Sequence, residues 1–132
     1  MTHKFTVRVY YEDTDLAGIV YYANYLKFIE RARSTIVLEA GIDQLEMQRN
    51  GLVFAVKKVE ADYIGSAKLN DDLRVETKIQ QVTGARIVFA QDVYRAEVLI
   101  FSALVTAVCI TTTGKITRFP AKIRANLEDA SK

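Results

Sequence analysis

Hydrophobic and polar residues alternate along the first twelve positions of the chain and then change to a helical spacing. Phe5, Val7 and Val9 are separated by single polar residues, which predicts a half-buried β-strand over residues 2–12. From position 22 apolar side chains recur every three or four residues, which predicts a helix of about five turns ending at Gly41. The helical stripe consists of Tyr22, Tyr25, Leu26, Ile29, Ala32, Ile36, Val37 and Ala40.

The rest of the chain has the pattern of long strands. A short amphipathic stretch at residues 43–49 comes first, and a polar tail begins at Pro120. The connections between the strands are short enough for antiparallel hairpins. One strand, a long helix and further strands predict an α+β fold, with one helix packed on an antiparallel sheet in a single domain over residues 1–132. The later predicted strands are Val53–Gly65, Asp72–Thr83, Ala85–Ala96 and Val98–Thr113.

A small open sheet of this kind has an edge that needs protection. An edge strand presents unpaired backbone N–H and C=O groups to any other chain. We therefore expect a homo-oligomer, a dimer in which a second copy pairs with the sheet edge. A monomer by light scattering would contradict this expectation.

Composition and charge exclude several classes of protein. The chain has 18 Lys plus Arg against 16 Asp plus Glu, interspersed rather than gathered into a basic segment, so we expect no nucleic-acid partner. His3 is the only histidine and Cys109 the only cysteine. We therefore expect no disulfide, no metal site of the usual Cys/His kind, no cofactor and no histidine-based triad. The chemistry left is that of carboxylates, backbone amides and tyrosines.

The chain shows no segment of the length that a membrane span requires. Its most apolar window, Val98–Ile110, would extend about 20 Å as a helix, short of the roughly 30 Å of a bilayer core. The first residues have no apolar stretch of signal-peptide type. We expect a cytoplasmic protein without an integral membrane segment.

Carboxylates and tyrosines crowd the segment just before the predicted helix. Glu12, Asp13 and Asp15 lie within four positions, and Gly18 closes the loop that they begin. A helix N-terminus beside them would offer unsatisfied amides and a partial positive charge. The alternative is structural: an aspartate shapes the turn, and tyrosines pack in the core. Five of the seven tyrosines lie here: Tyr10, Tyr11, Tyr21, Tyr22 and Tyr25.

The segment Val7 to Arg33 contains Asp-Thr-Asp-x-x-Gly-Ile-Val-Tyr-Tyr-x-x-Tyr. This long mixed motif resembles that of hotdog-fold acyl-CoA thioesterases of the 4-hydroxybenzoyl-CoA thioesterase type, most of all the branch encoded beside the Tol-Pal envelope genes of Gram-negative bacteria. The resemblance implies a hotdog fold with a five-stranded antiparallel sheet. It also implies hydrolysis of an acyl-CoA to a free acid and coenzyme A, at a site between the two subunits of a dimer that often pairs again into a homotetramer.

The resemblance also assigns site residues. It implies that Asp15 carries catalysis and that the backbone amide of Tyr22, at the helix start, holds the thioester carbonyl. In the Tol-Pal branch the position of Tyr22 is often a histidine, and here the sequence departs from that branch. Arg86 and Arg118 are candidates for the phosphates of coenzyme A, although both could be ordinary exposed strand-end charges. Tyr25 is a further candidate for contact with the substrate.

A thioester is a substrate that such a site could hydrolyse. Its leaving thiol should resemble that of cysteine, with a pKa of about 8.5, so a strong general acid is less necessary than for an amide. Asp15 would act as nucleophile or as general base, and the sequence leaves both open. A hydratase of the same fold would need a catalytic histidine near Asp15. The other alternative is a non-catalytic module that binds acyl-CoA or acyl carrier protein in envelope or lipid metabolism.

Overall fold

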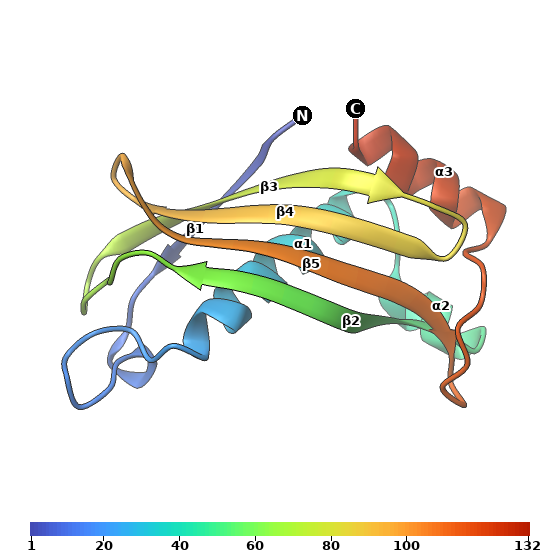
Figure 1. The fold of residues 1–132 in the computed structure, drawn as a ribbon. Helices are drawn as coiled ribbons and strands as arrows, with labels where there is room; N and C mark the ends of the chain where they lie inside the picture. Colours follow the sequence, from blue (N-terminus) through green and yellow to red (C-terminus); the bar gives the residue numbers. More distant parts are fainter.

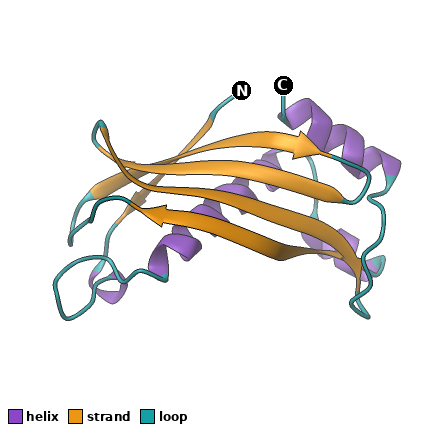
Figure 2. Ribbon diagram, viewed as in Figure 1, coloured by secondary structure: helices purple, strands orange, loops and turns teal.

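The computed structural model describes residues 1–132 and shows one long helix lying on one face of a five-stranded antiparallel sheet (Figures 1 and 2). This arrangement confirms the predicted α+β architecture. The strands are β1 (His3–Arg8), β2 (Leu52–Tyr63), β3 (Asp72–Val82), β4 (Arg86–Arg95) and β5 (Val98–Thr111), and the helices are α1 (Asn24–Glu39), α2 (Gln44–Arg49) and α3 (Ala121–Ala130).

The strand order in the sheet is β1-β3-β4-β5-β2, with every neighbouring pair antiparallel. The strand β2, which follows α2 in the chain, is therefore an edge strand. It pairs with β5 so that Tyr63 lies opposite Phe101 at one end and Leu52 opposite Thr111 at the other. None of the helices has the length and apolar character that crossing a membrane requires.

Two element boundaries differ from the sequence prediction near the N-terminus. The first strand ends at Arg8, because Tyr11–Asp13 form a turn of 3₁₀ helix. The long helix begins at Asn24 and not at Tyr22, because residues 21–24 form a turn in which the Asn24 N–H donates to the carbonyl of Tyr21 at 2.8 Å. Tyr22 thus precedes α1 instead of opening it.

The polar segment after Pro120, whose structure the sequence does not decide, forms the helix α3. Leu127 of α3 is fully buried in the hydrophobic core, with Ile123 and Ala130 packed beside it. We expect Leu127→Ala to lower the free energy of unfolding by about 2–4 kcal/mol, because the truncation loses apolar contacts and leaves a cavity. Urea denaturation measures this change, with Lys122→Ala on the exposed side of α3 as the control. An unchanged midpoint for Leu127→Ala would mean that α3 detaches before the core unfolds.

The helix α1 covers only part of the sheet. It packs over β1, β3 and β4, where the side chains of Phe28, Ile29 and Ala32 are almost completely buried. Because paired residues point to the same face, Val56 and Val59 of β2 face the helix side, as do their buried partners Ala107 and Val105. Even so, Val56 is 51% exposed and Val59 is 40% exposed. An apolar strip of the edge strand is thus left uncovered.

A β-bulge keeps these two valines on one face. The pairing of β2 with β5 shifts between Val56 and Lys58, so that Lys57 is the extra residue of the edge strand. Because Lys57 is the extra residue, Val56 and Val59 pair with residues two apart on β5, and their side chains point to the same face of the sheet. The consecutive residues Lys57 and Lys58 lie at this bulge, in the middle of the exposed edge.

Candidate active site

The loop before α1 is fastened to the helix by a buried aspartate. Asp13 is 5% exposed. Its Oδ2 accepts the backbone N–H of Tyr10 at 2.8 Å, and its Oδ1 accepts the side-chain amide of Asn24 at 2.9 Å. Since Asn24 is the first residue of α1, Asp13 holds the loop against the helix N-terminus. Asp13 therefore has the structural role that the sequence left open for the aspartates of this loop.

Asp15 lies at the far end of the same loop and is only partly buried. Its Oδ1 accepts the backbone N–H of Ala17 at 2.9 Å and, more weakly, that of Ile19 at 3.4 Å. Its Oδ2 has no donor within the chain, and no cation pairs with the carboxylate. The turn closes at Gly18, whose φ of +81° is a conformation that favours glycine. Asp15 thus keeps one carboxylate oxygen free on a fixed loop.

The loop is a small hairpin that sets the spacing between Asp15 and Tyr22. The Tyr21 N–H donates to the carbonyl of Asp13, and the Asp15 N–H donates to that of Ile19. Two residues of extended chain separate these rungs, so Asp15 lies about 7 Å along the hairpin from the start of the turn that holds Tyr22.

The backbone N–H of Tyr22 has no acceptor within the chain. No side chain caps α1, whose N-cap residue is Ala23, and the N–H groups of Asn24 and Leu26 donate to the carbonyls of Tyr21 and Ala23. Unsatisfied N–H groups at a helix N-terminus attract an oxygen that carries negative charge. The Tyr22 side chain is 62% exposed, and its backbone carbonyl accepts the hydroxyl of Tyr63 at 3.0 Å.

An aromatic cluster supports this turn from the sheet side. Tyr25 stacks on Phe101 with ring centroids 5.0 Å apart and meets Tyr63 edge-on at 5.8 Å. Tyr63 also meets Tyr22 at 6.1 Å. Burial raises the pKa of the Tyr25 phenol and that of Tyr63 above the ordinary value, so both remain neutral at physiological pH. The cluster comprises Tyr22, Tyr25, Tyr63 and Phe101.

Tyr25 is only 3% exposed. Within one chain its ring therefore serves as a wall of the core beneath Tyr22, and its contact with a substrate stays a prediction. The place of Tyr63 in this cluster could not be predicted from the sequence, because Tyr63 ends a strand and its partners lie 38 to 41 positions away in the chain. No local pattern marks such a contact.

The structure brings Arg86 and Arg118 together, away from Asp15. Arg86 opens β4 opposite Val108, whereas the aromatic cluster lies at Phe101 of the same neighbouring strand, about 23 Å further along. The guanidinium of Arg118 lies against Gly84, where an added Cβ would be 2.8 Å from Nη2. The loop before α1 and the β3–β4 turn are at opposite ends of the sheet (Figure 1).

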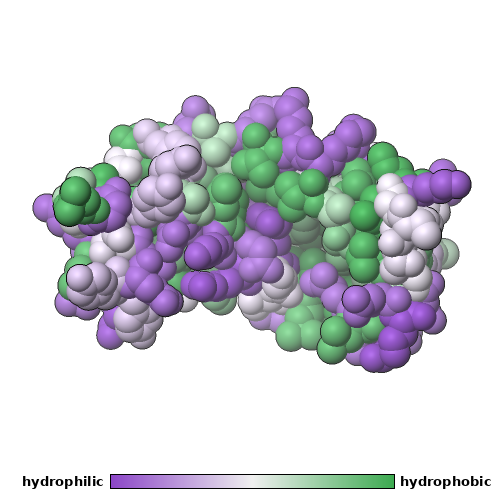
Figure 3. Space-filling model, turned by 90° about the horizontal axis from the view of Figure 1, so that it is seen from below, coloured by the Kyte–Doolittle hydropathy of each residue, from purple (hydrophilic) through white to green (hydrophobic).

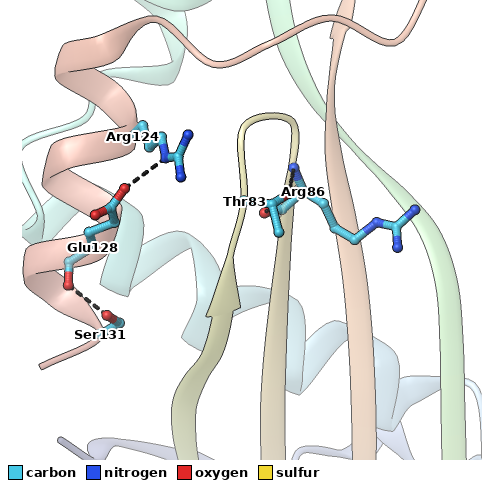
Figure 4. Close-up of polar contacts among 5 residues, drawn as sticks. All are labelled: Thr83, Arg86, Arg124, Glu128 and Ser131. Carbon is cyan, nitrogen blue, oxygen red and sulfur yellow. Dashed lines mark hydrogen bonds and ion pairs between the residues drawn. The ribbon is translucent and has the colours of Figure 1, made fainter.

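The β3–β4 turn presents Arg86 to solvent. The Arg86 N–H donates to Oγ1 of Thr83 at 3.1 Å, which closes the turn. Figure 4 shows the Arg86 side chain pointing away from α3, on which Arg124 is held by Glu128 at 2.7 Å. Arg86 has no acidic partner within 4 Å and is free to bind an anion.

One long helix on a five-stranded antiparallel sheet, with an aspartate loop leading to the unpaired Tyr22 amide just before the helix, is the arrangement of a hotdog-fold enzyme domain. The family description "Thioesterase-like superfamily" matches residues 9–127. The chain belongs to this superfamily.

Individual relatives agree with the family. The chain is 41% identical over 125 residues to the acyl-CoA thioesterase YbgC of Haemophilus influenzae, covering 92% of this chain and 91% of that protein. It is 34% identical to a probable thioesterase from Bartonella henselae of known structure, with a TM-score of 0.82 and coverage of 90% and 98%. A Staphylococcus aureus protein solved in complex with CoA shares the fold, with a TM-score of 0.91, 16% identity and coverage of 99% and 84%.

Proposed function

We propose that this chain is an acyl-CoA thioesterase that hydrolyses the thioester to a free acid and coenzyme A, with Asp15 and the Tyr22 amide as its reacting groups. The observation that carries the proposal is that a free carboxylate oxygen of Asp15 and an unsatisfied backbone N–H of Tyr22 lie on the two sides of one hairpin. The similarity to YbgC of Haemophilus influenzae supports the substrate class.

In the proposed reaction the thioester carbonyl oxygen accepts the Tyr22 N–H. As the carbonyl carbon is attacked, negative charge gathers on that oxygen, and the amide and the helix N-terminus stabilise it. Asp15 either attacks the carbon to form a mixed anhydride, which water then hydrolyses to the free acid and the restored carboxylate, or removes a proton from the attacking water. Coenzyme A leaves as a thiolate, so no strong acid is required at its sulfur.

The test is the release of free thiol from a panel of acyl-CoAs of different chain length, aromatic and aliphatic. Cys109 is fully buried, and burial raises the pKa of its thiol, so a thiol reagent reads the released coenzyme A and not the protein. Saturable thiol release supports the proposal. Binding of acyl-CoA without thiol release would instead favour a non-catalytic binding module. Acyl carrier protein is the second acyl donor to include in the panel.

We also propose that the complete site needs a second copy of the chain. An antiparallel pairing of β2 with β2 of another copy would set the Tyr63 end of one strand beside the Leu52 end of the other. The β3–β4 turn of the second copy, with Arg86 and Arg118, would then lie near Asp15 of the first. The position of β2 at the edge of the sheet supports this pairing, because its outer backbone groups have no partner strand. A further pairing into a tetramer is part of the proposal.

Arg86 would bind the phosphates of coenzyme A in this assembly. We expect Arg86→Ala to raise KM for acyl-CoA about 5- to 10-fold with little change in kcat, and the effect to shrink at high salt because charges in water are screened. The matched control is the N-acetylcysteamine thioester of the same acyl group, which has no phosphates and should be hydrolysed equally by both proteins. An equal loss on both substrates would mean that Arg86 supports the fold.

The substrate class also sets the expected compartment. Because acyl-CoAs are cytoplasmic metabolites, we propose that the protein acts in the cytoplasm. The resemblance to the Tol-Pal branch supports a physiological role linked to the cell envelope, which growth of a deletion strain under envelope stress would test.

A further inference from the structure

A groove runs between α1 and the uncovered side of β2. Leu26, Ile29 and Glu30 line it from the helix, and Val56 and Val59 line it from the edge strand. It continues past Arg33 into a cavity of about 180 Å³ beneath Phe54 and Phe89. Seen from the side on which β2 is the nearest strand, the surface has a hollow with hydrophobic residues at its margin (Figure 3). This α1–β2 groove begins one helical turn beyond Tyr22.

Arg33 lies where the groove meets the cavity, and its guanidinium is largely buried. Its Nη1 donates to Oε1 of Gln91 at 2.9 Å. Gln91 is itself fully buried and is held in place by the carbonyl of Ile29 and the hydroxyl of Thr77, both of which accept from its amide nitrogen. The guanidinium is thus fixed in one position, while its other N–H groups have no acceptor within the chain.

The negative charge of Glu30 lies near the positive charge of Arg33, whereas most N–H groups of Arg33 have no acceptor. Burial lowers the pKa of Arg33, and the negative charge of Glu30 partly offsets this effect. The two side chains form no ion pair within 4 Å, because Glu30 accepts the Ser34 hydroxyl at 2.7 Å instead. The groove therefore ends in a donor and an acceptor side by side. A hydroxyl group, which accepts and donates at once, matches this pair, whereas a carboxylate would be repelled by Glu30.

The length of the groove sets the size of its occupant. From Tyr22 to Arg33 the helix path measures about 16 Å, and the Arg33 side chain points back toward the helix N-terminus, which leaves about 10–12 Å. An extended chain advances about 1.2 Å per bond. An acyl group of about eight to ten carbons, with its carbonyl at the Tyr22 amide, would place its last carbon at Arg33.

We propose that the α1–β2 groove selects acyl groups of medium length that carry a hydroxyl at the far end, and that Arg33 and Glu30 are the specificity-determining residues. The inference rests on the proposed thioesterase function and names its substrate class. The apolar residues of the groove contact the methylene groups. Arg33 donates to the terminal hydroxyl oxygen, and the hydroxyl donates to Glu30.

The experiment compares 10-hydroxydecanoyl-CoA, decanoyl-CoA and the CoA monothioester of decanedioic acid. We expect kcat/KM for the hydroxylated chain to exceed that for decanoyl-CoA about 10- to 100-fold, less than in a fully enclosed site because the groove is open to water. The dicarboxylic chain should fall below the hydroxylated one. In Arg33→Met the ratio should drop to about 1, and Arg33→Lys should restore part of the preference.

Arg31→Met, an exposed change on the same helix, is the matched control and should keep the wild-type ratio. Equal rates on the hydroxylated and plain chains in the wild type would overturn the inference even if Arg33→Met fails to fold. So would a preference for the dicarboxylic chain, or a change of oligomeric state in Arg33→Met with the tail preference unaltered. Thiol release from short acyl-CoAs alone would overturn the inference but not the function, whereas no release from any acyl-CoA would overturn both.

Discussion

Asp15→Asn should lower kcat about 10³-fold with little change in KM, which is in the range that a general base or nucleophile contributes. Asparagine keeps the shape of the side chain, and its carbonyl oxygen can still accept the Ala17 N–H that Oδ1 now accepts. It neither attacks the thioester nor takes a proton from water. Thiol release at saturating acyl-CoA measures kcat, and the binding of a non-hydrolysable thioether analogue shows that the site is still formed.

The control for this change is Glu12→Gln, which removes the same charge from an exposed residue of the same loop. It should leave kcat within about twofold, since single exposed charges contribute little. Near-wild-type turnover in Asp15→Asn would remove Asp15 from the reaction. An equal loss in both variants would point to the field of the whole loop rather than to one carboxylate.

Tyr22→Pro should lower kcat about 10²–10³-fold, because proline has no N–H and the proposed carbonyl donor disappears with it. Proline is tolerated around the first turn of a helix, where amides have no helical partner. The Tyr63 hydroxyl can keep its bond to the backbone carbonyl of this position. Thiol release again measures the effect, and circular dichroism checks that α1 remains.

Tyr22→Ala separates the amide from the ring. It keeps the N–H and loses the contacts with Tyr21 and Tyr63, so kcat should stay within about tenfold of the wild type. A large loss in alanine as well as in proline would assign the effect to the aromatic ring. Equal activity in all three proteins would mean that another amide of the α1 N-terminus holds the carbonyl.

The extent of the sheet could be predicted because its strands are long and alternate regularly. The strands β2 to β5 begin and end within two residues of the predicted bounds. The start of α1 was wrong by two residues, since the apolar spacing of Tyr22 continues the helical stripe. The turn closed by the Asn24 N–H on the Tyr21 carbonyl, and the bond between Asp13 and Asn24 that joins the loop to the helix, show where the helix begins.

The candidate site was harder to predict than the fold. Asp15 and Tyr22 could be named because they fall in one short motif, and their roles stay predictions. The contact of Arg33 on α1 with Gln91 on β4 joins residues 58 positions apart, and no periodicity of the sequence indicates it. Likewise α3 could not be predicted, because ten residues with one fully buried side chain give too weak a pattern.

The bulge at Lys57 has a consequence for how this edge can be extended. A regular edge strand can be matched in many registers and can template further strands without limit. Here the rungs change phase midway along β2, and two adjacent lysines occupy that point. A strand that pairs with this edge must match the bulge at one position, or it loses the backbone hydrogen bonds on one side of the bulge. The edge therefore favours pairing with one strand in one register, and it disfavours the repeated addition of strands that leads to fibrils.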